Sequence, residues 1–345
     1  MKILLGEWNM KLNNLLTKFT LLILFGTLIG VIAGCASSAN KNEDGENKPD
    51  KIRLDYAYYS PTSLILKEHG LLEEAFAEEG IEIEWSLSQG SNKSLEFLNS
   101  NSVDFGSTAG AAALISKANG SPIKNVYIFS KPEWTALVTH ADSEITSVAD
   151  LAGKKVAATL GTDPYIFLLR ALDAEGVAID EVEIVNLQHG DGASSLISGS
   201  IDAWAGLDPH MARLEIEADA ELFYRNVDFN TYGFLNVRED FAKNYPTYVN
   251  RVIEAYENAR EWALEHPEET AALLASEAGI PLEVAKIQIE RTDFTNPIPG
   301  QVQEEAIIEA GKVLQASEVI DSDLDLEEIV ADLIESSFAI ETINN

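Results

Sequence analysis

Short β-like runs alternate with helical stretches along most of this chain of 345 residues. The run IEIEWSL at residues 81–87, for example, alternates apolar and polar side chains in the way of a strand with one buried face. Strands that alternate with helices are typical of an α/β fold. Because the alternation restarts after about residue 140, the sequence predicts two α/β lobes in succession.

Individual elements can be predicted from the residues that flank them. The first strand is expected at residues 52–59, and Ser60 followed by Pro61 is a typical helix start. In the second half, strands are expected at residues 155–158, 182–187 and 201–205, with helices at residues 164–174, from Ala193 and from Pro209. From Phe241 onward, apolar residues at helical spacing predict a C-terminal third that is almost entirely helical.

The chain is expected to cross between the lobes twice, near residues 134–140 and again near residues 232–237. These crossings assign residues 51–138 and 235–345 to lobe 1, and residues 139–234 to lobe 2. Two such lobes leave a cleft, onto which the C-terminal ends of strands and the first turns of helices face. The sequence therefore predicts a ligand site between the lobes.

The N-terminus has the pattern of an export signal. Lysines precede an apolar run at residues 19–33, which is shorter than the roughly 20 residues that a membrane-spanning helix needs. The run leads into Ala33-Gly34-Cys35, which resembles a bacterial lipobox, and Cys35 is the only cysteine of the chain. We therefore expect cleavage after residue 34 and a lipid on Cys35 that anchors the protein at the outer face of the cell membrane.

The segment that follows Cys35 carries no large apolar residue up to residue 50. Such a segment cannot offset the entropy lost on ordering, so residues 35–50 are expected to form a lipidated, flexible tether. Removal of residues 1–34 changes the formal net charge from −33 to −35. A charge of this sign argues against binding to nucleic acid and to anionic lipid surfaces, which both require basic patches.

Enzymatic chemistry finds little support in the residue pattern. The five histidines are scattered and none has the spacing of a zinc-binding helix. His189 and Asp191 supply at most two metal ligands, and a histidine in a loop is more often solvated or part of a cap. No Gly-x-Ser-x-Gly motif surrounds Ser107 or Ser194. We therefore expect no enzyme activity, no cofactor and no metal.

Three glycine-containing loops come directly after predicted strands and begin helices. They contain Ser107 and Thr108, Gly161 and Thr162, and Gln89 and Ser91. Free N–H groups at a helix start attract anions, and hydroxyl groups add further donors. Each loop on its own is compatible with ordinary helix capping, but three of them at corresponding strand ends favour a binding site.

The chain resembles the solute-binding lipoproteins of ABC importers, most closely the branch for aliphatic sulfonates, nitrate and taurine. The resemblance lies in LKEHGLLEEAFAEEGIEIEW, LEFLNSNSVDFGSTAG, ITSVADLAGKKVAATLGTDPYIFLLRALDAEGV and SGSIDAWAGLDPHMA. It implies a two-lobed periplasmic-binding-protein-like fold of type II, a monomer that closes on a small organic anion and delivers it to a permease with its ATPase. A structural lipoprotein without a transport role remains the alternative from another class.

The resemblance also places residues at the cleft. Trp204 and Asp208 correspond to the cleft wall of the family, with Trp204 as an apolar face for a carbon tail or, alternatively, as a buried strand residue. Tyr58 and Tyr59 end the first predicted strand, and alternation favours only one of them, Tyr59, as a cleft residue.

Three further residues concern closure and ligand choice. Thr135 and Tyr232 lie at the two crossings and are expected to reach the solute when the lobes close. Asp163 stands where relatives carry a second hydroxyl residue, and its carboxylate would cap the helix start and repel a sulfonate. This departure keeps taurine, nitrate and a heterocycle resembling a thiamine precursor open as alternatives to an aliphatic sulfonate.

Overall fold

Two β-sheets organise the structure, a computed structural model that describes residues 47–344. The residues from Pro49 onward form one compact unit. The predicted signal peptide, Cys35 and most of the predicted tether lie outside the described residues. At the start of the first sheet, the Asp50 carbonyl oxygen accepts a hydrogen bond from the Glu82 N–H at 3.1 Å.

The first sheet has six strands in the order β11-β4-β10-β3-β1-β2. Strand β1 is parallel to β2 and β3, whereas β10 is antiparallel to β3 and β4, and β11 is antiparallel to β4. Their bounds are β1 Lys51–Tyr56, β2 Glu82–Leu87, β3 Phe105–Ala109, β4 Ile123–Pro132, β10 Gly233–Arg238 and β11 Thr292–Asp293.

Strand β1 ends three residues earlier than the sequence predicts. Ala57 and Ser60 close a turn, in which the Ser60 N–H donates to the Ala57 carbonyl oxygen at 3.0 Å. Tyr58 and Tyr59 therefore lie in a turn and not in a strand. The expectation that alternation turns only one tyrosine toward the cleft was wrong, because the period of two ends with the strand.

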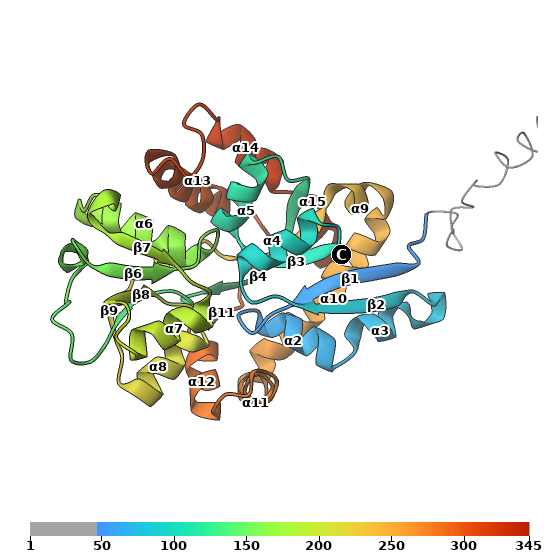
Figure 1. Cartoon of the computed structure of the whole chain (residues 1–345). Coiled ribbons are helices and arrows are strands. Elements are labelled where there is room, and N and C mark those ends of the chain that lie inside the picture. The colour runs from blue at the N-terminus through green and yellow to red at the C-terminus, as the bar shows by residue number, and fades with distance from the viewer. Residues whose placement is uncertain (1–46, 345) are drawn as a thin grey trace, which may run out of the picture. The chain divides into compact units, whose positions relative to one another are not determined.

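Helices cover both faces of the first sheet (Figure 1). They are α2 (Pro61–Glu68), α3 (Leu71–Phe76), α4 (Ser91–Asn99), α5 (Gly110–Ala118), α9 (Glu239–Asn244) and α10 (Pro246–Glu265). Pro61 occupies the start of α2, as predicted. Helix α10 is the longest of the described helices and buries one side through residues at helical spacing, among them Val249, Val252 and Tyr256.

The second sheet has five strands in the order β7-β6-β8-β5-β9. Its strands are β5 (Leu137–Thr139), β6 (Lys155–Ala158), β7 (Glu183–Asn186), β8 (Ala203–Ala205) and β9 (Glu221–Tyr224), and its helices are α6 (Asp163–Glu175), α7 (His189–Ile197) and α8 (His210–Ala218). The predicted helix start at Ala193 was wrong. Helix α7 already begins at His189, directly after the extended residue Gln188.

In each sheet, the strand that directly follows a crossing is antiparallel to its neighbours: β5 in the second sheet and β10 in the first. The chain leaves the first sheet after Pro132 and enters the second at Leu137, and it returns between Tyr224 and Gly233. Strand β5 then inserts beside β8, and β10 inserts beside β3. The two crossing segments lie side by side, since the Thr135 N–H on the first donates to the Asn230 amide oxygen on the second at 3.1 Å.

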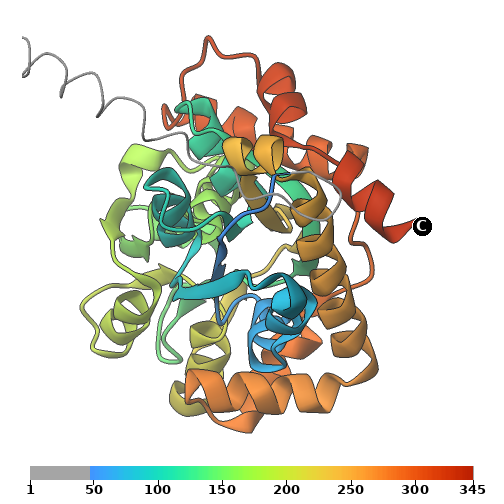
Figure 2. The ribbon, with the colours of Figure 1, turned by 90° about the vertical axis from the view of Figure 1, so that its right-hand side faces the viewer.

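The C-terminal helices touch both lobes. They are α11 (Pro267–Ala278), α12 (Leu282–Glu290), α13 (Gln301–Ala316), α14 (Leu326–Leu333) and α15 (Ser337–Ile343). Helix α12 contacts α8 on one side of the boundary, and α13 contacts α5 and α6 on the other. In Figure 2 this segment, coloured orange to red, extends from the lower edge of the view to its upper right.

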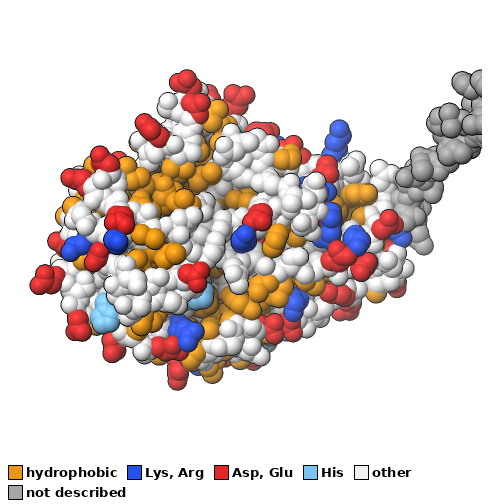
Figure 3. All heavy atoms as spheres, viewed as in Figure 1, with side chains coloured by type: hydrophobic (Ala, Val, Ile, Leu, Met, Phe, Trp, Pro, Cys, Tyr) orange, Lys and Arg blue, Asp and Glu red, His pale blue; other side chains and the backbone are white. Residues whose placement is uncertain are grey.

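Acidic side chains are scattered over the face seen in Figure 3, with Lys and Arg side chains among them. Within residues 47–344, no helix is both long and apolar enough to cross a bilayer.

Candidate functional site

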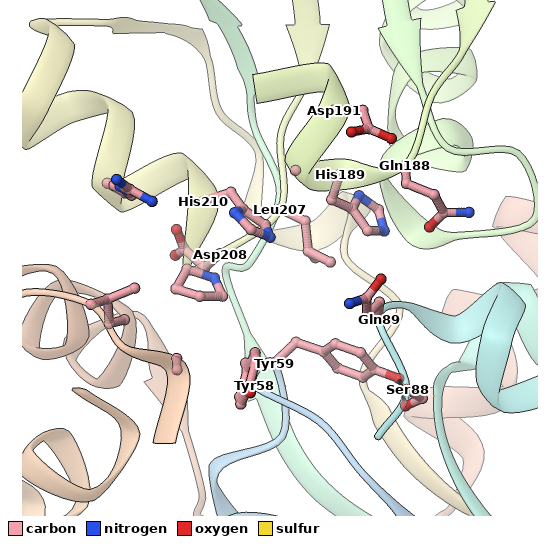
Figure 4. A pocket seen from close by; sticks show the side chains of 15 residues that line it. Tyr58, Tyr59, Ser88, Gln89, Gln188, His189, Asp191, Leu207, Asp208 and His210 are labelled. Atoms are coloured by element: carbon pink, nitrogen blue, oxygen red, sulfur yellow. Dashed lines mark hydrogen bonds between the residues drawn. The ribbon is translucent and has the colours of Figure 1, made fainter. Parts of the chain in front are cut away.

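A cavity of about 330 Å³ lies between the lobes. Its size is typical of a site for a small organic molecule. Figure 4 shows the side chains that converge on it from both sheets. The lining consists of Tyr58, Tyr59, Ser88 and Gln89 from lobe 1, Gln188 to Asp191, Leu207 to His210 and Arg213 from lobe 2, and Ala278 and Ile280 from the C-terminal helices.

Most of these residues follow the C-terminal ends of strands. Ser88 and Gln89 come after β2, Gln188 and His189 after β7, and Leu207 shortly after β8. In α/β sheets, ligands bind at this end of the strands because the first turns of the following helices meet there. The cavity thus lies where the repeated strand and helix pattern predicts it.

A buried carboxylate supports the lobe 1 side of the cavity. Asp55 on β1 is fully buried and accepts hydrogen bonds from the Ser88 hydroxyl at 2.7 Å and from the Ser107 N–H at 2.8 Å. Burial raises the pKa of Asp55 to about 6, although the hydrogen bond from Ser88 acts in the opposite direction. The Tyr59 hydroxyl donates to the Ser107 carbonyl oxygen at 2.8 Å and lies 3.1 Å from the Ser88 hydroxyl.

His189 forms part of the lobe 2 wall at the start of α7. Its side chain is 2% exposed, and Nδ1 lies 3.2 Å from the Thr159 hydroxyl oxygen. Burial, with a smaller effect of His210, lowers the pKa of His189 to about 3. The imidazole is therefore neutral at pH 7.

Asp208 links lobe 2 to the C-terminal helices. Its carboxylate accepts from the Ala212 N–H at 2.8 Å and forms an ion pair with Arg291 at 3.3 Å. Arg291 also pairs with Glu215 on α8 at 2.6 Å. Burial raises the pKa of Asp208 to about 6, against the effect of Arg291. Since Arg291 follows α12, this side of the boundary is held by charge as well as by packing.

The first turns of α5 and α6 are occupied by the second crossing. The N–H of Gly110 donates to the carbonyl oxygen of Thr231 at 3.1 Å, and the N–H of Ala111 donates to the Thr231 hydroxyl at 3.0 Å. The Asp163 carboxylate accepts from the Trp134 indole N–H at 2.8 Å and from the Thr231 N–H and hydroxyl at 3.0 and 2.6 Å. Burial raises the pKa of Asp163.

Little space remains at the start of α6. A cavity of about 10 Å³ lies there, lined in part by Thr162 and Asp163 and by Ser91 at the start of α4, and such a volume holds about one water molecule. In this structure the N–H groups of Gly110 and Ala111 are bonded within the protein, and so are the hydroxyls of Thr108 and Thr162. The Ser107 hydroxyl, by contrast, is buried and has no hydrogen-bond partner among the described residues.

Comparison with known families identifies the chain. The profile of a family described as NMT1/THI5 like matches residues 74–270, which is more than half of the sequence. The chain belongs to the NMT1/THI5-like family.

Relatives of this NMT1/THI5-like chain are binding proteins and not enzymes. It is 27% identical over 312 residues to a Bacillus subtilis protein with the provisional name aliphatic sulfonates-binding protein, covering 90% of this chain and 93% of the relative. It is 24% identical to the taurine-binding periplasmic protein of Escherichia coli, covering 61% of this chain and 68% of the relative. The chain is thus a solute-binding protein.

Solved structures confirm the predicted two-lobed, periplasmic-binding-protein-like fold. The alkanesulfonate-binding protein SsuA from Xanthomonas axonopodis pv. citri, bound to MOPS, superposes with a TM-score of 0.76 at 22% identity, covering 84% of this chain and 99% of that one. SsuA from Escherichia coli gives a TM-score of 0.71 at 24% identity, with 81% and 92% covered. A desulfurization enzyme, DSZB, shares the fold with a TM-score of 0.63 at 16% identity, so the fold alone does not define an activity.

The predicted site residues of this NMT1/THI5-like protein fall into three groups. Tyr59, Gln89 and Asp208 line the large cavity, and Ser91, Thr162 and Asp163 line the small one together with Tyr59. The remaining predicted residues line neither of these two cavities: Ser107, Thr108, Thr135, Gly161, Trp204 and Tyr232. Their contact with a solute stays a prediction.

Local contacts explain why two of the remaining residues point elsewhere. The Thr108 hydroxyl accepts from the Asn236 amide at 2.8 Å and donates to the Ala109 carbonyl oxygen at 3.0 Å. Trp204 is fully buried and packs against Gly192 and Met211 in the core of lobe 2. Trp204 is therefore the buried strand residue that the sequence allowed as an alternative to a cleft residue, since side chains alternate between the two faces of a strand.

Gly161 lies at the lobe boundary, because a Cβ atom added there would stand 3.8 Å from Cβ of Asn92. Thr135 and Tyr232 are buried at the crossings, and Lys131 Nζ lies 5.5 Å from the centre of the Tyr232 ring.

Several cavity residues were missed from the sequence. The sequence places His189 and Asp191 in a loop before the helix predicted from Ala193, whereas both lie in the first turn of α7. Within residues 47–344 no cluster of three or more potential metal ligands occurs. Tertiary packing alone brings three further residues to the cavity: His210 and Arg213 from α8, and Ile280 after α11. No local sequence pattern predicts their position.

Proposed function

We propose that this protein is the extracytoplasmic solute-binding component of an ABC importer, and that it captures a small sulfonate between its lobes for delivery to a permease and its ATPase. The observation that carries the proposal is the cavity at the strand ends of both lobes, in a chain related along 90% of its length to a protein named for aliphatic sulfonates. Binding as a monomer to the permease, with closure of the lobes at the crossings, is part of the same proposal.

The cavity offers different surroundings to the two ends of such a solute. Tyr58, Leu207 and Ile280 provide apolar surface for a carbon chain. The first turn of α7, with N–H groups that have no partner within the helix, favours an anionic group, and the exposed Arg213 adds a positive charge. Hydrogen bonds to a charged group contribute about 1.5–3 kcal/mol each, so a few of them support micromolar affinity, which needs about 8 kcal/mol.

An aminosulfonate such as taurine is the second candidate. Asp191 and Asp208 carry carboxylates at the same cavity, and His189 is neutral there. A zwitterion can place its sulfonate near Arg213 and its ammonium near these groups. Nitrate lacks a carbon chain to contact the apolar wall, and a heterocycle resembling a thiamine precursor remains part of the panel to be tested.

Attachment to the membrane is proposed through a lipid on Cys35. The support lies in the sequence, where an apolar signal leads directly into the only cysteine. The fatty acid, palmitate in the usual case, would hold the acidic body at the outer face of the cell membrane.

Isothermal titration of residues 49–345, which form one compact unit, tests the binding function. The panel comprises alkanesulfonates, taurine, nitrate and pyrimidines, and we expect a sulfonate to bind with micromolar affinity or better. Gln89→Ala removes a cavity side chain and should weaken binding by about tenfold, equal to about 1.4 kcal/mol. Gln301→Ala, on the exposed start of α13, is the matched control and should leave affinity unchanged.

Failure of every compound to bind would favour a structural lipoprotein. Turnover of any compound would instead favour an enzyme with this fold.

A further inference from the structure

Two buried polar atoms that can accept hydrogen bonds lie close to Gly90 at the lobe boundary. They are Nε2 of His189, in the first turn of α7, and Oδ1 of Asn92, in the first turn of α4. A Cβ atom added to Gly90 would stand 2.8 Å from this Nε2 and 2.9 Å from this Oδ1. The absence of a side chain at Gly90 therefore leaves room for the two atoms, one from each lobe, to converge.

Both atoms are buried and have no hydrogen-bond partner within the part of the chain that the structure describes. The His189 side chain as a whole is only 2% exposed. A buried polar group without a partner costs about 1–3 kcal/mol, so proteins rarely keep two of them together unless a ligand or water completes the site.

The hydrogen bonds around His189 define which of its nitrogens carries the proton. The Thr159 hydroxyl donates its single hydrogen to the Leu187 carbonyl oxygen at 2.6 Å. Its oxygen can then only accept from Nδ1 of His189, at 3.2 Å. A neutral imidazole has one N–H, so Nε2 is left as a lone-pair acceptor.

This arrangement distinguishes solutes by what they present at the boundary. A sulfonate or carboxylate oxygen placed there would meet two lone pairs and be repelled. An amino or ammonium group has several N–H donors and can bond to Nε2 and Oδ1 at once. Because neither acceptor touches solvent in this structure, such a group would enter with the lobes apart and bridge them on closure.

We propose that His189 and Asn92 are specificity-determining residues that select a solute with an amino or ammonium group, and that Thr159 is the positioning residue for His189. The proposal rests on the proposed binding function of the adjoining cavity, which His189 lines (Figure 4). In a sulfonate, the amino group would lie between the lobes while the anionic group faces the start of α7 and Arg213.

Two matched solutes test this selection by titration calorimetry. Taurine and propane-1-sulfonate share the sulfonate and the chain length, and they differ by an ammonium group in place of a methyl group. We expect taurine to bind at least about tenfold more tightly. Asn92→Leu and His189→Phe should each reduce the ratio of the two affinities toward one.

Asn92→Asp tests the orientation of the Asn92 amide. The carboxylate keeps an acceptor and adds charge, so the preference for taurine should be kept or increased. If instead Asn92 used its NH₂ group as a donor to His189, Asn92→Asp would reduce the affinity for taurine, and the proposal would be overturned.

A measurement on the solute-free protein examines the tautomer directly. Long-range proton–nitrogen NMR correlation should show a protonated Nδ1 and a bare Nε2 for His189, with loss of this preference in Thr159→Val. A proton on Nε2 in the unaltered protein would overturn the proposal whatever binds.

The outcomes separate the proposal from the binding function that it rests on. Equal affinities for the two sulfonates would refute the selection of an amino group and leave the sulfonate-binding function standing. Binding of neither compound would refute both.

Discussion

Asp163 joins parts of the structure that are distant in sequence, and its replacement by alanine should be strongly destabilising. The carboxylate is 1% exposed and accepts three hydrogen bonds, one from Trp134 on the first crossing and two from Thr231 on the second. Since Asp163 starts α6, these bonds tie a helix of lobe 2 to both crossing segments.

The magnitude follows from the number of bonds and the cost of the buried charge. Hydrogen bonds to a charged group contribute about 1.5–3 kcal/mol each, which gives a gross contribution of about 4.5–9 kcal/mol. Burial of the carboxylate, which raises the pKa of Asp163, offsets part of this. For Asp163→Ala we expect a loss of about 3–5 kcal/mol in the free energy of unfolding, because the donors of Trp134 and Thr231 stay buried without a partner.

Asp163→Asn should lower the free energy of unfolding by about half as much as Asp163→Ala. Its amide oxygen can still accept from the Trp134 indole and the Thr231 N–H, whereas its NH₂ group cannot accept from the Thr231 hydroxyl. The matched control is Asp173→Ala at the exposed end of the same helix, for which we expect a change within about 0.5 kcal/mol.

Urea unfolding, followed by circular dichroism and tryptophan fluorescence with coincident transitions, measures all three variants. The expected order of destabilisation is Ala at 163, then Asn at 163, then the control. A loss below about 1 kcal/mol for Asp163→Ala would refute the view that this carboxylate holds the crossings together.

Two further variants probe the cavity. Asp55→Asn should flatten the pH dependence of the melting temperature. Between pH 3.8 and about 6, Asp55 keeps its proton in the folded protein but has released it in the unfolded chain. The contribution of Asp55 to stability is therefore lost as the pH rises through this range. Melting temperatures of both proteins across pH 4–7 measure this, and parallel curves would contradict it. Gly90→Ala should weaken solute binding at least tenfold, since φ is +146° and the added Cβ would stand 2.8 Å from His189. Gly80→Ala, with φ +65° and open space, should retain affinity, and equal affinities in titration of the two variants would contradict the reasoning.

The two-lobed architecture could be predicted because its signals are local. Residues 155–158 were expected as a strand and form β6, and the helix expected at residues 164–174 is α6 with one more residue at each end. Periods of two and 3.6 in apolar residues arise from the geometry of strands and helices themselves, so they are visible without any partner.

The binding site was predicted less completely, and the reason is the distance in sequence between its parts. The sequence predicts free N–H groups at the start of α5. In the structure these N–H groups donate to Thr231, which lies 120 residues from Ala111. Likewise, Arg213 and Ile280 come to the cavity through helix packing that no local pattern encodes.

The sequence by itself determined the order of strands and helices, the duplication into lobes and the acidic surface, because each depends on neighbouring residues or on composition alone. Tertiary structure decided which polar groups are already bonded within the protein and which remain open to a solute. That distinction depends on pairs such as Asp163 with Thr231, or His189 with Asn92, which come together only when both sheets and both crossings are assembled.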